Sequence, residues 1–152
     1  MLVSAYALGI RIDEMQVFPD DDCFAIRQAA RYVSQLYDRH LTEVGLTITQ
    51  FSILSRISRA ASMTMKVLAD QMVMERTTLV RAIQPLQRDG LLQSRSAATK
   101  GRELALSLTE AGEAKLAAAR VCWHAAQDDF ERRFGAQRAA SLRRELFDMT
   151  KA

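Results

Sequence analysis

Apolar side chains recur at helical spacing in the first third of the chain. After the acidic run at residues 20–22, a stripe with steps of three and four predicts a long helix that ends at Gly45. Its members are Ala29, Val33, Tyr37, Leu41 and Val44. Residues 1–22 lack a sustained period and are expected to form an N-terminal arm.

The same helical spacing returns at the C-terminal end. Thr109 can cap a second long helix, which Gly135 would terminate. Beyond it, Leu142, Leu146 and Met149 share one face of a final helix. These apolar faces exceed what one small domain can cover, so they predict a second copy of the chain as partner.

Shorter helices are predicted between these long ones. Thr47 and Gln50 form a capping box at the start of a helix that buries Phe51, Leu54 and Ile57. Local capping and the apolar stripe agree, which makes this helix the best specified of the short ones.

Two further helices follow, joined by a tight turn. Thr64 can cap a short one, and the next spans about residues 76–89 with Leu79, Ile83 and Leu86 as its inner stripe. We expect the stripe to continue through Pro85, so the proline bends this helix without ending it.

A β-hairpin is predicted after Gly90. Residues 91–95 and 103–108 bracket a loop of small and basic side chains, and the second segment alternates apolar and polar positions as a half-buried strand does. The expected fold is mainly α with a small β-hairpin, a winged helix-turn-helix with N- and C-terminal dimerisation helices. We divide the chain into an arm at 1–22, dimerisation helices at 23–45 and 109–152, and a DNA-binding lobe at 46–108.

One face of the 76–89 helix carries donors instead of apolar groups. In a winged helix-turn-helix this second helix enters the major groove, where Arg can pair with guanine and Gln with adenine. The candidate base- and phosphate-contacting residues of this helix are Arg76, Thr77, Thr78, Arg81 and Gln84. The alternative is that they form an ordinary solvated helix face.

Charge distribution favours DNA as the partner. Between Arg56 and Arg102 the chain has nine Lys and Arg against three Asp and Glu, whereas its overall net charge is only +3. A local positive excess of this kind suits a polyanion such as double-stranded DNA. Predicted contacts from the hairpin are Arg95, Lys100 and Arg102.

Other classes of protein find little support in the sequence. No apolar run approaches a bilayer span and no leader-like segment opens the chain, so we expect a cytoplasmic protein with no membrane partner. Cys23 and Cys122 form neither a disulfide framework nor a metal motif, and no cofactor is expected. His40 and His124 lie on separate predicted helices without a nucleophile elbow or phosphate loop, which argues against an enzyme. A winged helix used only for protein interaction is the remaining rival.

Four short segments resemble the MarR family of bacterial transcription regulators. They are Gly-Leu-Thr-Ile-Thr-Gln-Phe at 45–51, Arg-Thr-Thr-Leu at 76–79, Gly-Leu-Leu at 90–92 and Ser-Leu-Thr-Glu-Ala-Gly at 107–112. The resemblance implies a homodimeric repressor that binds a pseudo-palindromic operator, with Arg102 reaching the minor groove. The family usually has an aspartate two positions before that arginine; this chain has Lys100, which removes the usual orienting partner.

The resemblance also implies that an effector releases the DNA. Cys23, followed by Phe24, and Tyr37 resemble the peroxide-sensing OhrR branch, although Ile48 stands where that branch has a second tyrosine. The alternatives are a purely structural cysteine and a small aromatic or phenolic ligand. Candidate ligand contacts are Tyr37, Arg39 and His40, and a histidine beside apolar neighbours is more often a hydrogen-bonded structural residue.

Overall fold

The computed structural model describes residues 21–96 and 104–151. The predicted arm and the loop with Lys100 and Arg102 therefore lie outside the described residues. By their internal contacts the described residues form two units, 21–33 and 34–151, and each is described by itself.

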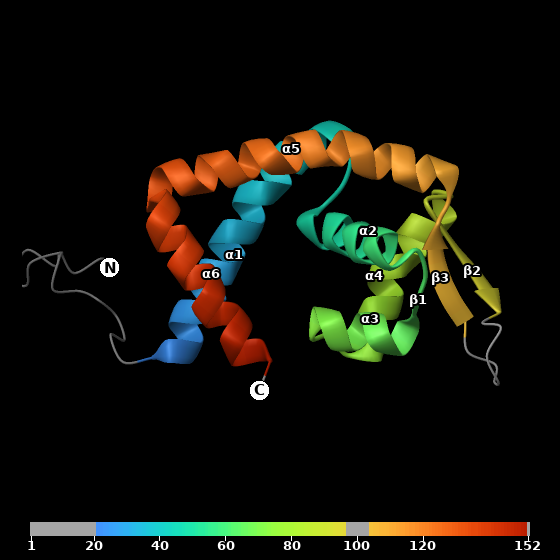
Figure 1. Ribbon diagram of the computed structural model, residues 1–152, viewed down its shortest axis with the longest axis horizontal. Helices are drawn as coiled ribbons and strands as arrows, with labels where there is room; N and C mark the ends of the chain where they lie inside the picture. The colour runs from blue at the N-terminus through green and yellow to red at the C-terminus, as the bar shows by residue number, and fades with distance from the viewer. Residues whose placement is uncertain (1–20, 97–103, 152) are drawn as a thin grey trace, which may run out of the picture. The chain divides into compact units, whose positions relative to one another are not determined.

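The described elements are mostly helices with one small sheet (Figure 1). In chain order they are α1 Asp22–Leu41, the 3-10 turn η3 Thr42–Val44, α2 Ile48–Ala60, β1 Met63–Thr64, α3 Met65–Met72, α4 Arg76–Arg88, β2 Leu92–Ser96, β3 Leu104–Leu108, α5 Glu110–Phe134 and α6 Ala136–Thr150. This arrangement confirms the predicted winged helix-turn-helix class. None of the described helices has both the length and the apolar character that a bilayer span requires.

The unit of residues 21–33 is the first part of α1. The Asp21 carboxylate accepts a hydrogen bond from the Phe24 backbone N–H at 2.8 Å, which satisfies one of the free donors at the helix start. Cys23 lies in this first turn and is exposed.

In the larger unit, α1 ends four residues earlier than predicted. The α-helix stops at Leu41 and a 3-10 turn continues to Val44, where the Gly45 N–H donates to the Thr42 carbonyl at 3.0 Å. This i→i+3 bond tightens the last turn, and Gly45 follows it in the left-handed region at φ 70°. The last predicted turn before Gly45 is therefore a 3-10 turn instead of regular α-helix.

The predicted caps are present in the structure. Thr47 and Gln50 make both bonds of the capping box at the start of α2. Thr64 accepts from the Val67 N–H before α3, and Thr109 accepts from the Gly112 N–H before α5. Local sequence thus determines where these three helices begin.

The sheet contains one strand that the sequence did not predict. Its order is β1-β3-β2, with both pairs antiparallel. β3 is central because Leu106 pairs with Met63 on one side and with Ser94 on the other. β1 has two residues, too few to show a period of two, so only its pairing with β3 reveals it.

The core joins the short helices to α5 and the sheet. α5 packs on α2 and β3, lying across both in Figure 1. The buried residues of this core include Leu41, Phe51, Ile53, Leu54, Ile57, Leu68, Leu79, Ile83, Leu86, Leu106 and Leu116. Because this cluster contains the whole inner stripe of α4, the core holds α4 in a fixed orientation.

Candidate nucleic-acid interface

α4 is the second helix of the helix-turn-helix. α3 ends at Met72, and the chain turns through Val73 in the left-handed region at φ 50° and ψ 46°. The Met74 N–H donates to the Ala69 carbonyl at 3.0 Å, which ties the turn back to α3. α4 begins two residues later, at Arg76.

The two faces of α4 differ as the sequence predicted. Leu79, Ile83 and Leu86 are at most 2% exposed. At 100° per residue the opposite pole of the helix falls on Thr77, Arg81, Gln84 and Arg88, and all four are exposed. Arg76 and Thr78, in the first turn, are exposed as well. Pro85 lies inside the helix without ending it.

The donors on this outer face are available to a ligand. Within residues 21–96 and 104–151, the side chains of Arg76, Thr77, Arg81 and Gln84 make no hydrogen bond or ion pair with the protein. Arg88 differs, because its Nε donates to the Asp89 carboxylate at 3.1 Å. The first three turns of α4 therefore present unpartnered hydrogen-bond donors to solvent.

Hydrogen bonds join the end of α4 to α5 and to the start of the hairpin of β2 and β3, which we call the wing. Gly90 adopts φ 71°, the Leu91 N–H donates to the Leu86 carbonyl and the Gly90 N–H donates to the Gln87 carbonyl, which is a Schellman motif. Thr109 then joins these elements: its N–H donates to the Leu91 carbonyl at 3.1 Å and its hydroxyl to the Gly90 carbonyl at 2.5 Å. One threonine thus connects the last turn of α4 to the first turn of α5.

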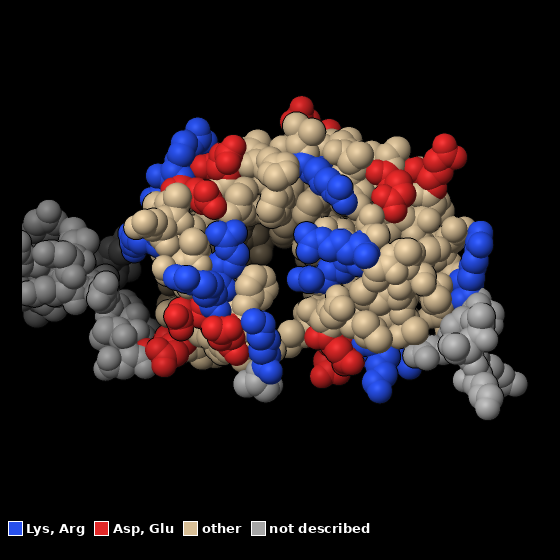
Figure 2. Space-filling model, viewed as in Figure 1, with Lys and Arg blue, Asp and Glu red and all other residues tan. Residues whose placement is uncertain are grey.

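Basic residues outside α4 extend the candidate interface. Arg95 lies on β2, opposite Ala105 of β3, and is exposed. Lys66 on α3 is exposed too. Its charge is part of the local positive excess, but it was not among the predicted DNA contacts. Another group of Lys and Arg side chains lies over α2 on the face seen in Figure 2. The arginines of α2 are Arg56 and Arg59, which are not assigned to the interface.

The candidate effector residues Tyr37 and His40 both contact α5. The Tyr37 hydroxyl donates to Gln127 Oε1 at 2.5 Å, and its ring lies 6.4 Å from that of Trp123. Burial raises the pKa of the Tyr37 hydroxyl above its usual value, and the Glu131 carboxylate raises it further. Tyr37 is therefore a neutral donor anchored between two helices.

His40 has the character of a structural histidine. Its Nε2 lies 3.4 Å from Asp129 Oδ2, and Arg133 donates to the same carboxylate at 2.9 Å. The Arg133 hydrogen bond, with help from His40, holds the pKa of Asp129 at about 2. Arg39, by contrast, is exposed and has no such partner within the described residues.

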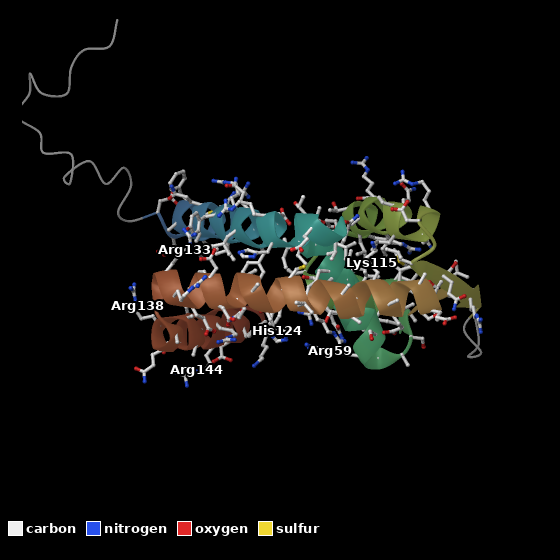
Figure 3. All side chains as sticks on the ribbon, turned by 90° about the horizontal axis from the view of Figure 1, so that it is seen from above. Arg59, Lys115, His124, Arg133, Arg138 and Arg144 are labelled. Atoms are coloured by element: carbon white, nitrogen blue, oxygen red, sulfur yellow. The ribbon has the colours of Figure 1, made fainter. Side chains whose placement is uncertain are left out.

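Two contacts to the η3 turn position α5 further. Lys115, labelled in Figure 3, extends from α5 and donates to the Val44 carbonyl at 3.2 Å. Cys122 is buried with its Sγ 3.9 Å from the Glu43 carboxylate. The described residues contain no cluster of three or more His, Cys, Asp or Glu that could hold a metal ion.

Comparisons with known proteins give a consistent result. A sequence model of the MarR family matches residues 44–103. The crystal structure of the M. tuberculosis transcriptional regulator MosR in complex with DNA is 36% identical, with a TM-score of 0.76 over 87% of this chain and 95% of that one. No curated protein matches the sequence.

More distant structures share the fold. A mutant of E. coli MarR complexed with operator DNA is 20% identical, covering 82% of this chain and 90% of that one, with a TM-score of 0.74. CouR from Rhodococcus jostii RHA1 bound to p-coumaroyl-CoA is 19% identical, covering 89% and 95%, with a TM-score of 0.75. With the exposed donor face of α4 and the identity to MosR, the chain belongs to the MarR family of winged helix-turn-helix transcriptional regulators.

Proposed function

We propose that this protein is a homodimeric transcriptional repressor that binds a pseudo-palindromic operator through α4 and the wing. The observation that carries the proposal is the outer face of α4, where Arg76, Thr77, Arg81 and Gln84 offer donors that no described residue engages. The DNA-bound structure of the 36% identical MosR supports the same reading.

Each donor has a role in this proposal. Arg81 and Gln84 read guanine and adenine edges in the major groove, because their side chains form bidentate pairs with those bases. Arg76, Thr77 and Thr78 in the first turn of α4 contact phosphates or base edges. Arg95 and the wing residues Lys100 and Arg102 add contacts to the backbone and the minor groove.

The exposed face of α6 supports a dimer. Leu142, Leu146, Phe147 and Met149 are between 39% and 55% exposed, which leaves a large part of the apolar surface of these four side chains in water. A second copy that covers this face would remove that surface from solvent. Two-fold symmetry would then present two α4 helices about 34 Å apart, one turn of DNA.

Release by an effector completes the proposal. In the ligand route, a small aromatic or phenolic molecule displaces the Tyr37 hydroxyl from Gln127 and disturbs the neighbouring Trp123. The bound p-coumaroyl-CoA of CouR is in keeping with that route. In the oxidant route, the exposed Cys23 thiol is the target.

The proposal is tested by selecting oligonucleotides from a random pool with the purified protein. We expect one enriched two-fold symmetric sequence, bound with an affinity that falls steeply as salt rises. Association that is insensitive to salt, with no enriched sequence, would instead support the protein-interaction module. Repeating the binding with hydroperoxide and with phenolic acids separates the two release routes.

The role of α4 is tested with Arg81→Ala. We expect loss of discrimination between the selected and scrambled duplexes, with the dimer intact. Arg102→Ala should weaken binding to both duplexes. Arg120→Ala, which removes an exposed arginine of α5, is the matched control and should keep the discrimination. Full discrimination by Arg81→Ala would contradict the assignment of α4.

A further inference from the structure

Val80 lies on the outer side of α4, beside the polar donors. It is 36% exposed, three residues after Thr77 and four before Gln84. At 100° per residue Thr77 and Gln84 lie on the exposed pole of the helix, and Val80 lies beside them, about 40° to 60° nearer to the buried stripe. Val80 is thus the apolar member of a face that otherwise carries hydrogen-bonding groups.

Neither the core nor the helix accounts for this valine. The other large apolar side chains of α4, Leu79, Ile83 and Leu86, are buried, whereas Val80 stays 36% exposed. A β-branched side chain is also a poorer helix former than alanine or the long polar residues. Its position on the donor face therefore points to a role outside the folded chain.

We propose that Val80 contacts the C5-methyl group of a thymine in each operator half-site and so selects a T·A pair there. This inference rests on the proposed DNA-binding function. Among the four bases only thymine displays a methyl group in the major groove, and apolar side chains recognise it by contact. Thr77 and Gln84 on either side can hold the helix in register while the valine meets the methyl group.

Valine suits this contact because its side chain is stiff. In a helix its χ1 angle has one strongly preferred rotamer, so its two methyl groups are already oriented before DNA binds. No rotamer entropy of this side chain therefore has to be lost when the contact forms. The small favourable energy of one apolar contact is then not cancelled by an entropic cost.

The test uses thymine without its methyl group. In the duplex selected by the wild-type protein, each thymine in turn is replaced by uracil, and affinities are measured by gel shift. We expect one thymine per half-site at which uracil lowers wild-type affinity about fourfold, the value of one buried methyl group. Val80→Ala should bind the thymine duplex about fourfold more weakly and be indifferent to uracil at that position.

Two controls separate the contact from other effects. Val121→Ala makes the same change at an exposed valine of α5, and this variant should keep the wild-type response to uracil. Uracil also alters the stiffness of DNA, but Val80→Ala and wild type meet the same duplex, so the difference between them isolates the contact.

The outcomes distinguish this inference from the function on which it rests. A selected site at which Val80→Ala keeps the full uracil effect, or at which wild type shows none, overturns the role of Val80 alone. Failure of the selection to enrich any sequence overturns the proposed function together with this inference. Coincident thermal unfolding of Val80→Ala and wild type shows that the variant is folded.

Discussion

Gly112 lies against the carbonyl oxygen of Leu91 with no room for a side chain. A Cβ added to Gly112 would be 2.1 Å from that oxygen and 3.3 Å from the Cβ of Leu108. The first turn of α5 is therefore seated directly on the backbone that leaves α4. Together with the Thr109 bonds to the same segment, this contact fixes α4 relative to α5.

We predict that Gly112→Ala destabilises the protein by about 2 kcal/mol, because the backbone must shift to admit the methyl group. The loss should occur although alanine is the better helix former by about 1 kcal/mol. Chemical denaturation measures the difference. Ala114→Gly, at an exposed position of α5, gives the propensity effect alone, and equal stability of Gly112→Ala and wild type would contradict the contact.

The turn between α3 and α4 carries a second prediction. Val73 has φ 50° and is 74% exposed, although a β-branched residue is disfavoured in the left-handed region. Val73→Gly should stabilise the protein by about 1 kcal/mol, which raises Tm by about 3 °C for a chain of this size. Val73→Ala keeps a Cβ, so its Tm should rise by less than that of Val73→Gly. A lower Tm for Val73→Gly would show that the valine side chain contributes contacts that outweigh the strain.

Acid stability should depend on Asp129. Its pKa in the folded protein is about 2, below the ordinary value of 3.8, so the ionised form is stabilised by folding. That contribution is present above pH 4 and is lost as the pH falls towards 2. Wild type should therefore lose stability over this range relative to Asp129→Asn, as measured by urea unfolding at successive pH values.

The neighbouring carboxylate provides the control for this pH dependence. Asp128→Asn removes an exposed acid from the same turn of α5. It should keep the wild-type dependence between pH 4 and pH 2. The same slope in Asp129→Asn as in wild type would show that the bond from Arg133 does not persist in solution.

The apolar face of α6 predicts how the protein assembles. Leu146→Asp places a charge in the exposed stripe and should halve the mass measured by light scattering while abolishing operator binding. Gln137→Asp places the same charge about 180° away from Leu146 around the helix and should leave the mass unchanged. A wild-type protein that is already monomeric at micromolar concentration would refute the proposed dimer.

Much of the fold could be predicted because its signals are local. Thr47 with Gln50, Thr64 and Thr109 begin their helices through bonds to residues three positions away, and Gly90 ends α4 through its own backbone geometry. The inner and outer faces of α4 follow from the spacing of its apolar residues. Neighbouring residues in the sequence are neighbours in a helix, so these features are visible without any tertiary information.

Other features depend on residues that only packing brings together. β1 is recognised only by its pairing with Leu106. Tyr37 and His40 bond to residues of α5 that lie about ninety positions later in the sequence. Position 112 requires glycine because the carbonyl oxygen of Leu91 leaves no space for a Cβ. No local sequence pattern predicts such contacts, because the energy of each contact depends on how two distant segments are arranged. By itself the sequence determined the helices, the hairpin and the two faces of α4. The tertiary structure decided that β1 forms, which donors of α4 stay unpartnered and that Val80 stays partly exposed, because each of these depends on contacts between distant segments.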